Sequence, residues 1–403
     1  MSRVPGLHDP RTDALLDTAT YADASAAHGV YSDLRSAPGL AWNDTAGFWA
    51  VARHADVLAV SADPARFCSS RGILVEEIGR TYDSPPTMMH TDPPAHTRYR
   101  SLVFPGFRPR AVRDLEPAVL ALAAELLDAL PAGEPVDVVT DLAVPFPIRV
   151  IVAMLGLDRA DEDRVWRWSE AAIPGATDWS EDERMTLLGE MTVELLGLAA
   201  DRRSAPRDDV VSMLAGVEVD GERLSADELG MFLVQLLVAG NETTRHAVSG
   251  GVVALAADRA QWDRLVADRA LVPTAVEEVL RWTSPVTSFL RAATVDSEVA
   301  GTPVRAGDPL LLLYASANRD EAAFGPTASR FDVGRTPNHH VAFGFGPHFC
   351  LGAALARLEI AVVLEGLLDR FTGLSIPEGA VIERSGSSVI GGIRRAEVVL
   401  DKS

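Results

Sequence analysis

Apolar residues recur at helical spacing along most of this chain, whereas a few shorter runs have the pattern of strands. The helical spacing is clearest over residues 110–130, 160–171, 181–200 and 353–371. Strands are predicted over residues 48–52, 299–304, 309–313 and 397–400. Neither a repeat nor a composition break divides the 403 residues. We therefore expect one domain over residues 1–403 that is mainly α with minor β.

One further predicted helix is unusually long. Ser225 and Glu228 form a capping box, and the helical pattern then continues to about Ala257 without a proline. Such a helix would be about 45 Å long. It is apolar on nearly all sides, which indicates burial, yet its centre reads Asn241-Glu242-Thr243-Thr244. Buried polar residues need a reason, and either a functional site or a kink with locally satisfied side chains would supply one.

The strongest chemical signal is a glycine-rich loop, Phe343-Gly344-Phe345-Gly346-Pro347-His348-Phe349-Cys350-Leu351-Gly352. Cys350 stands just before a predicted helix, where unpaired amides and the helix dipole favour a thiolate. The glycines allow sharp turns and the close approach of a flat ligand. The alternative is a buried structural cysteine, which we expect for Cys68. A zinc site is disfavoured because no second cysteine or histidine pair lies at zinc spacing.

Composition disfavours several classes of partner. The net charge of −20 argues against nucleic acid and anionic membranes and favours solubility. The first residues contain no apolar signal-peptide core, and the longest apolar run, residues 231–240, is too short to span a bilayer. Because the chain has only two cysteines, we expect no disulfide framework and a location in the reducing cytoplasm.

The Phe343-to-Gly352 loop resembles the haem-binding loop of the cytochrome P450 family, here of the soluble bacterial, actinobacterial type. Further matches follow in chain order from about Asp92 to Gly352. The resemblance implies the family's fold, a triangular-prism-like domain with a long central I helix and a cysteine-ligand loop. It also implies haem b (iron protoporphyrin IX), with the Cys350 thiolate as the axial iron ligand that promotes O–O cleavage. The other haem contacts that it implies are Phe343, Gly344, Gly352, Ala239 and Gly240.

The segment Ala239-Gly240-Asn241-Glu242-Thr243 resembles the family's oxygen-activating motif. By resemblance, Gly240 would make room for dioxygen, Thr243 would hydrogen-bond it, and Glu242 would carry protons from solvent. Heterolytic cleavage of the O–O bond needs two protons, so a hydroxyl beside a carboxylate has a chemical purpose. Thr243 and Glu242 are therefore the expected catalytic residues.

The two propionates of a haem need cationic or hydrogen-bonding partners. By resemblance these partners are His96, Arg100, Arg291 and His348. His96 and Arg100 lie one turn apart on a predicted helix and so face the same way. Taken alone, each of these residues is more typical of a surface position, but together they form a consistent set.

A second set of charged residues has an expected structural role. Glu278 and Arg281 lie three residues apart in a helical pattern and can form an ion pair. The resemblance adds Arg335 and implies a buried network beneath the haem. A solvated surface pair is the alternative.

Substrate contacts are the least constrained expectation. Family positions would place in the pocket the residues Met88, Met89, Gln235, Val238, Ala239, Val286, Thr287, Phe289 and Ile390. Most of them are apolar, which favours a bulky hydrophobic natural product such as a terpenoid, steroid or polyketide. Each is equally compatible with ordinary core packing. The sequence does not identify the substrate or distinguish hydroxylation from epoxidation.

No flavin- or nicotinamide-binding fingerprint is present, so electrons from NAD(P)H would arrive through a separate ferredoxin and ferredoxin reductase. Arg108, Arg110 and Arg113 would suit an acidic ferredoxin, or would form a solvated helix face. We expect a monomeric monooxygenase that uses O2, with a peroxide-driven enzyme as a variant. The alternative is a non-catalytic haem-binding sensor or auxiliary protein, which the presence of both Cys350 and Thr243 disfavours.

Overall fold

The computed structural model describes residues 8–80, 87–173, 177 and 179–402. Its α-helices are α1 (Thr18–Ala22), α2 (Ala24–Ser36), α3 (His54–Ala62), α4 (Ala95–Val103), α5 (Pro109–Ala129), α6 (Pro145–Met154), α7 (Glu162–Ala172), α8 (Glu181–Ser204), α9 (Val210–Gly216), α10 (Ala226–Ala257), α11 (Arg259–Ala267), α12 (Val272–Thr283), α13 (Tyr314–Ala317), α14 (Glu321–Phe324) and α15 (Ala353–Arg370). Its strands are β1 (Ala41–Asn43), β2 (Phe48–Val51), β3 (Phe67–Cys68), β4 (Pro135–Asp137), β5 (Ser288–Ala293), β6 (Ser297–Val299), β7 (Thr302–Val304), β8 (Pro309–Leu313), β9 (Gly373–Ser375), β10 (Glu383–Arg384), β11 (Ile393–Arg395) and β12 (Glu397–Asp401).

Helix α10 is the axis of the helical part of the molecule. Its 32 residues span about 48 Å. It begins at the predicted capping box, in which the Glu228 N–H donates to Ser225 Oγ at 3.0 Å and the Ser225 N–H donates to the Glu228 carboxylate at 2.7 Å. Helices α6, α7, α8, α12 and α15 pack against α10. These neighbours bury most of its length, as its apolar composition predicts.

A five-stranded sheet with the strand order β1-β2-β8-β5-β3 lies beside the helices. Strands β2 and β8 are parallel, and the other neighbours are antiparallel. Strand β8 is buried from Leu310 to Leu313, and its continuous apolar run is typical of a strand covered on both faces. Its partner β5 carries Arg291 opposite Leu310. The sheet therefore positions one of the predicted propionate ligands.

The predicted helices and strands agree with the structure to within a few residues, with one exception. Residues 299–304 were predicted as one strand, but the structure has a hairpin there, with β6 paired to β7. Ala300 and Gly301 form its turn, with φ angles of 52° and 74°. The pattern prediction was wrong because alanine rarely adopts the left-handed backbone conformation, so this pair is a weak turn signal.

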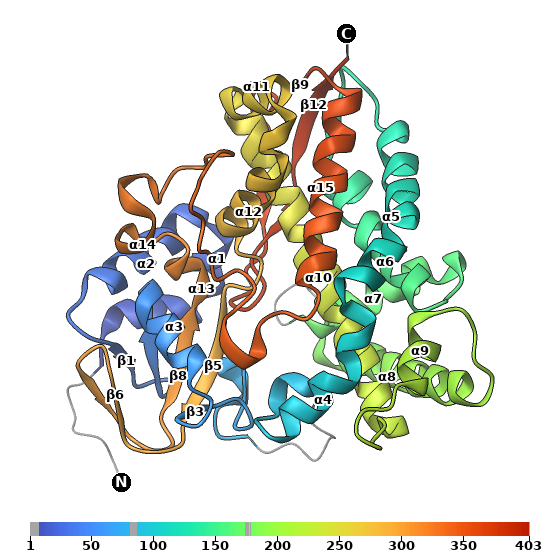
Figure 1. Ribbon diagram of the computed structural model, residues 1–403. Helices are drawn as coiled ribbons and strands as arrows, with labels where there is room; N and C mark the ends of the chain where they lie inside the picture. The colour runs from blue at the N-terminus through green and yellow to red at the C-terminus, as the bar shows by residue number, and fades with distance from the viewer. Residues whose placement is uncertain (1–7, 81–86, 174–176, 178, 403) are drawn as a thin grey trace.

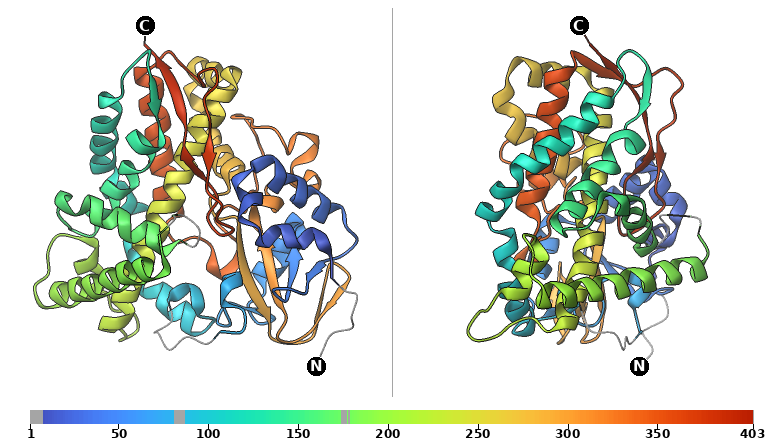
Figure 2. Two further views of the ribbon diagram at one scale, coloured as in Figure 1. Left: turned by 180° about the vertical axis from the view of Figure 1, so that it is seen from behind. Right: turned by 90° about the vertical axis from the view of Figure 1, so that its right-hand side faces the viewer.

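The helices form the larger part of the molecule, and the five-stranded sheet with α1, α2 and α3 forms the other side (Figure 1). The outline is triangular and tapers toward α11, β9 and β12. The molecule is thinner when viewed from the side (Figure 2). The main apolar core joins α5, α6, α8, α10, α12 and α15. Across the described ranges, no helix combines the length and the hydropathy that a membrane crossing requires.

Candidate active site

A cavity lies where α10, the five-stranded sheet and the loop before α15 meet. Cys350 lines it from that loop, and Ala239, Gly240 and Thr243 line it from α10. Arg291 lines it from β5. The fold thus brings the cysteine loop and the polar centre of the long helix to one cavity, although they are far apart in sequence.

The Cys350 side chain is exposed to this cavity rather than to bulk solvent. Its N–H donates to the Phe343 carbonyl oxygen at 2.9 Å, which holds the loop together. Enclosure by protein atoms raises the pKa of the thiol, whereas a hydrogen bond from the Gly352 N–H and the charges of Arg100 and Arg357 lower it. The sulfur therefore keeps its proton in the free protein and would release it on binding a metal.

Glycines shape the cysteine loop as the sequence predicts. Gly344 and Gly346 have φ angles of 68° and 73°, in the region that favours glycine. A Cβ atom on Gly346 would lie 2.3 Å from the carbonyl oxygen of Ser61 in α3. The loop therefore passes directly against α3, and this contact fixes its place in the cavity wall.

The wall formed by α10 consists of small residues and a hydroxyl. Ala239 is exposed in the middle of an otherwise buried helix, because its side chain faces the cavity. Thr243 Oγ1 donates to the Ala239 carbonyl oxygen at 2.7 Å, which leaves its oxygen free to accept a hydrogen bond from a group in the cavity. A Cβ atom on Gly240 would lie 3.1 Å from Ile151 Cδ1, so the glycine lets α6 pack closely here.

Glu242 does not line this cavity. Its carboxyl group is fully buried, with Oε1 3.3 Å from Ser169 Oγ, 3.4 Å from Asn241 Nδ2 and 3.3 Å from Arg245 Nη1. Oε2 has no hydrogen-bond partner. Burial raises the pKa of Glu242, and the charge of Arg245 opposes this. Glu242 therefore lies off the face of α10 that carries Thr243, because successive side chains leave a helix about 100° apart.

The remaining edge of the cavity is cationic. His96 and Arg100 reach it from α4, Arg291 from β5, and His348 from the cysteine loop. The His96 and His348 rings lie with their centroids 4.1 Å apart. Within the described residues, neither Arg100 nor Arg291 forms an ion pair with a carboxylate, and Arg291 Nη1 donates only to the neighbouring Leu290 carbonyl oxygen.

This cationic edge fits the two propionates of a haem. His96 Nε2 is buried and has no hydrogen-bond partner. Burial and the charges of Arg100 and Arg291 lower the pKa of His96, and burial with the charge of Arg291 lowers that of His348 to about 3. Two carboxylates would satisfy the unpaired imidazole and neutralise the two guanidinium groups. The residues present therefore fit a haem held by Cys350 and by these four side chains.

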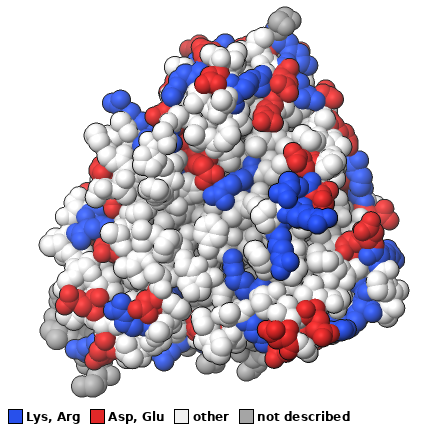
Figure 3. Space-filling view, viewed as in Figure 1, with Lys and Arg blue, Asp and Glu red and all other residues white. Residues whose placement is uncertain are grey.

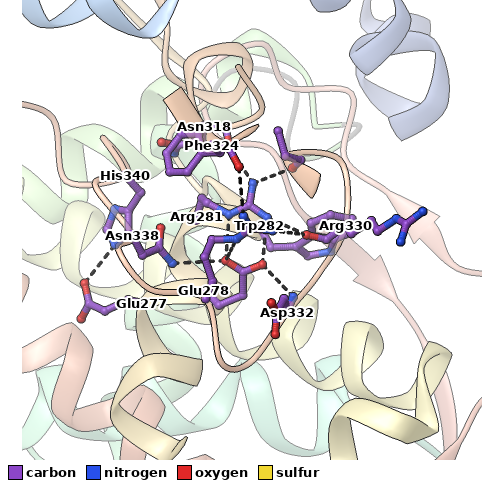
Figure 4. Close-up of polar contacts among 12 residues, drawn as sticks. Glu277, Glu278, Arg281, Trp282, Asn318, Phe324, Arg330, Asp332, Asn338 and His340 are labelled. Atoms are coloured by element: carbon purple, nitrogen blue, oxygen red, sulfur yellow. Dashed lines mark hydrogen bonds and ion pairs between the residues drawn. The ribbon is translucent and has the colours of Figure 1, made fainter. Parts of the chain in front are cut away.

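The Glu-x-x-Arg pair forms a buried network beside this site (Figure 4). The Glu278 carboxylate accepts from Arg281 Nε at 2.7 Å, from Arg281 Nη2 at 2.8 Å and from Arg335 Nε at 3.0 Å. Glu278 and Arg281 are 0% exposed, so the solvated-pair alternative does not apply. The Arg281 guanidinium also donates to the carbonyl oxygens of Asn318, Ala328 and Arg330. The network ties α12 to the segment that leads into the cysteine loop.

Most of the predicted substrate residues line the cavity, namely Met88, Met89, Gln235, Ala239, Val286 and Phe289. Three do not, and these expectations are corrected. The Thr287 hydroxyl turns away and donates to the Ser388 carbonyl oxygen. Val238 and Ile390 pack with Ile173 in a small apolar cluster that Phe289 also contacts. Family position alone did not reveal which side of the backbone each side chain would occupy.

Sequence reasoning also missed residues of the cavity wall. Four of them lie on α10, namely Phe232, Leu236, Thr244 and Ala247. Together with Gln235, Ala239 and Thr243 they form one face of the helix, at helical spacing. Helical periodicity could have identified them. Others come from distant elements and carry no local signal, namely Ile73, Phe107, Ile151, Tyr314 and Glu359.

The geometry does not support the alternative hypothesis of a zinc site at Cys350. Among the residues that the structure describes, no group of three or more His, Cys, Asp and Glu side chains could hold a metal ion. A cysteine without such partners suits haem iron, which takes one protein thiolate, and does not suit a zinc site. Cys68 is buried in β3, as expected for a structural cysteine.

Comparisons with known proteins agree with this geometry. The profile of the family described as "Cytochrome P450" matches residues 190–394. A steroid C26-monooxygenase of Mycobacterium tuberculosis is 39% identical over 90% of this chain and 97% of its own length. A methyl-branched lipid omega-hydroxylase of Mycobacterium bovis is 42% identical over 80% of this chain and 77% of its own length. The solved structure of a Mycobacterium marinum cytochrome P450 in complex with pseudoionone has a TM-score of 0.88 and 34% identity, and covers 99% of this chain and 100% of that chain.

These similarities extend over most of the chain and include its fold. The family's cofactor is haem b, which supplies oxygen-activating iron, and its reaction inserts one atom of O2 into an organic molecule with electrons from NAD(P)H. The chain belongs to the bacterial cytochrome P450 family and is a haem-dependent monooxygenase.

Proposed function

We propose that Cys350 is the thiolate ligand of the haem iron and that His96, Arg100, Arg291 and His348 bind the propionates. The observation that carries this proposal is a single cavity with a lone cysteine on one wall and an unpaired cationic edge on another. Phe343, Gly344 and Gly352 would shape the thiolate side of the haem. Ala239, Gly240 and Thr243 would face the oxygen side.

Thr243 would accept a hydrogen bond beside the bound dioxygen through its free lone pairs, and Glu242 would supply protons from its buried position next to Thr243 on α10. Arg245 and Ser169 orient the Glu242 carboxyl group, and burial keeps it able to take up a proton. A hydroxyl backed by such a carboxyl group suits a step that consumes protons.

The substrate that we propose is a bulky hydrophobic small molecule of the terpenoid, steroid or polyketide class, which the enzyme hydroxylates or epoxidises. The cavity lining supports this, because it includes the apolar side chains of Met88, Met89, Val286 and Phe289. The relatives that act on a steroid and a methyl-branched lipid also support it. Gln235 is the polar exception, and its buried Oε1 has no partner. A substrate hydroxyl group could donate to that oxygen.

Electrons would come from an acidic ferredoxin and its reductase. Arg108, Arg110 and Arg113 are exposed where α5 begins. Lys and Arg side chains gather toward the centre of the face that carries α4, α5 and α15, and many Asp and Glu side chains lie nearer its rim (Figure 3). A basic area on a chain of net charge −20 would select one docking face. The working unit that we propose is a monomeric single domain, residues 1–403, in the cytoplasm.

Titration of the ferric protein with a sterol, a methyl-branched fatty acid and pseudoionone tests the substrate class. A binder should displace axial water and shift the haem spectrum, and turnover with ferredoxin, reductase and NADH should yield a product heavier by one oxygen atom. Gln235→Leu should weaken binding of a hydroxylated ligand and leave that of its deoxy analogue unchanged. Spectral shifts only with small polar ligands would contradict the proposed substrate class.

A further inference from the structure

A second cavity, of about 800 Å³, lies between α2, the second half of α10 and the turn before β11. None of the described residues that line it also lines the cavity at Cys350, which we call the haem cavity. Ser25, Asp258 and Arg330 line the second cavity and are exposed, so a ligand can enter it from solvent. Its volume is in the range of cavities that hold small organic ligands.

The charges that line the second cavity are mainly positive. Three arginines contribute to the lining, namely Arg319, Arg330 and Arg384. Among the described residues that line it, Asp258 is the only acidic one. The Asp258 carboxylate already caps α11, where it accepts from the Ala260 N–H at 3.2 Å. A chain of net charge −20 thus has a locally positive cavity, which favours an anion as its ligand.

Arg319, between α13 and α14, is a cation without a counter-charge. Its guanidinium carbon lies 3.4 Å from the centroid of the Trp282 ring, and Nη2 donates to the Trp282 carbonyl oxygen at 3.1 Å. Its Nε atom is buried without a partner, and it forms no ion pair with a described carboxylate. Burial, and then the charge of Arg281, lower the pKa of Arg319 to about 9. Arg281 itself is paired with Glu278, so of these two guanidinium groups Arg319 is the one that lacks an anion.

Arg384 and His28 bring two more unsatisfied groups to the same cavity. Arg384 is half-buried in β10, and its guanidinium forms no ion pair or hydrogen bond with the described residues, although the charge of Asp23 acts on it. His28 Nδ1, on α2, is buried without a partner. Burial, and then the charges of Arg319, Arg35 and Arg384, lower the pKa of His28 to about 3. The positive groups therefore surround one imidazole, although they come from separate elements.

Much of the remaining lining is apolar. Val253 contributes from α10, and Ile376, Ile382 and Ile393 contribute from the chain around β10 and β11. Inorganic phosphate would pair with the guanidinium groups but leave this apolar surface in water. An aliphatic chain that ends in a carboxylate would cover the surface and pair with the same groups.

We propose that the second cavity binds an aliphatic carboxylate, with its carboxylate group on Arg319 and Arg384 and its chain against the isoleucines of the lining. His28, in the tautomer that carries a proton on Nδ1, donates to the same carboxylate group. The site shares no described lining residue with the haem cavity, so it is separate from the proposed catalytic residues and does not depend on their roles.

The test is calorimetric titration of the haem-loaded protein with dodecanoate, while phenylimidazole coordinates the iron and fills the haem cavity. Dodecanol, which lacks the charge, and inorganic phosphate, which lacks the chain, are the comparison ligands. The main variant is Arg384→Gln, because no described group depends on the Arg384 guanidinium. Arg395→Gln is the matched control, because Arg395 lies on the paired strand β11 and does not line the cavity.

Dodecanoate should bind to the wild-type protein and to Arg395→Gln with one equivalent and equal affinity. Arg384→Gln should bind it about tenfold or more weakly, because a charge-assisted hydrogen bond is lost. Dodecanol and phosphate should also bind about tenfold or more weakly than dodecanoate. Without ligand, Arg384→Gln should unfold at the same urea concentration as the wild type, since the arginine has no partner to lose.

Four results would overturn the site. They are no binding of dodecanoate to the wild type, equal affinity of the wild type and Arg384→Gln, binding of dodecanol or phosphate as tight as that of dodecanoate, and a lower urea midpoint of Arg384→Gln. The last result would show that Arg384 serves the fold and not a ligand. None of these results bears on the thiolate ligand, which the reduced carbon-monoxide spectrum tests separately.

Discussion

At the residue scale, the site depends on where each polar atom finds its partner. The Thr243 hydroxyl group donates its hydrogen bond to the Ala239 carbonyl oxygen. The lone pairs of Thr243 Oγ1 are therefore free to accept a hydrogen bond from a group in the cavity. His96 Nε2 and Glu242 Oε2 are each buried without a hydrogen-bond partner. In the proposed function, a haem propionate would pair with the first atom and a transferred proton would bind the second. An unpaired buried polar group costs stability, which makes these atoms informative about function.

Replacing Thr243 tests the oxygen side. Thr243→Ala should keep haem and substrate binding, because the side chain lines the cavity without holding other elements together. Product formed per NADH should fall severalfold, with peroxide as the by-product. Thr243→Ser retains the hydroxyl and should retain coupling. Equal coupling in wild type and Thr243→Ala would remove Thr243 from the mechanism.

The cationic edge predicts a pH effect that haem should abolish. In the folded apoprotein the pKa of His348 is about 3, whereas in the unfolded chain it is about 6.5. The unfolded state then binds more protons between these values, so stability should fall as pH drops below about 6.5. Haem propionates beside His348 would raise its pKa in the folded protein, so stability would depend less on pH. Urea midpoints of apoprotein and haem-loaded protein at several pH values measure it, and parallel curves would contradict the assignment.

Residue chemistry was predictable from sequence only where a local pattern defined it. The spacing around Cys350 predicted a tight loop before a helix, and the structure has that loop. The family resemblance placed Thr287 in the pocket, but a hydrogen bond to the carbonyl oxygen of Ser388, 101 residues away, turns the hydroxyl elsewhere. Contacts of that range are absent from any local pattern.

At the element scale, α10 and α12 position the site. Capping and apolar periodicity were sufficient to predict the bounds of α10. The network on α12 was predictable in type, since Glu278 and Arg281 share a helix face. The extent of this network was not predictable, because Arg281 also donates to backbone carbonyl oxygens of residues 318–330, which carry no side-chain signal. Glu242 illustrates the same limit: periodicity places it off the Thr243 face, but only the structure reveals Ser169 and His246 beside it.

Breaking the α12 network should destabilise the molecule strongly. Glu278→Gln would leave two buried guanidinium groups without their counter-charge, so the free energy of unfolding should fall by about 3–5 kcal/mol. Glu397→Gln, in an exposed pair with Arg395, is the matched control and should cost less than about 1 kcal/mol. Chemical unfolding of both variants provides the measurement. Equal losses would contradict the structural role of Glu278.

At the scale of the whole molecule, a triangular body encloses one haem cavity and leaves a basic area on an otherwise acidic chain. Composition predicted the net negative charge and argued against nucleic acid as a partner, but it did not predict where positive charge would gather. The second cavity behind α10 had no sequence signal, because α2, α10 and the turn before β11 meet only in the fold.

Charge reversal tests the proposed docking face. Arg110→Glu with Arg113→Glu should raise the KM for an acidic ferredoxin roughly tenfold or more at low salt, because steering by opposite charge is lost. Arg395→Glu, which reverses an exposed arginine on β11, is the control. Higher salt should reduce the difference between wild type and the double variant. Unchanged kinetics in the double variant would place the ferredoxin elsewhere.

The assignment of Cys350 is the central claim, and the reduced carbon-monoxide spectrum tests it most directly. The wild-type protein should have the long-wavelength Soret band of a haem with a thiolate ligand. Cys350→His, if it retains haem, should move that band to the position of a histidine-ligated haem. A histidine-type band in the wild-type protein, or an unchanged band in Cys350→His, would contradict the account.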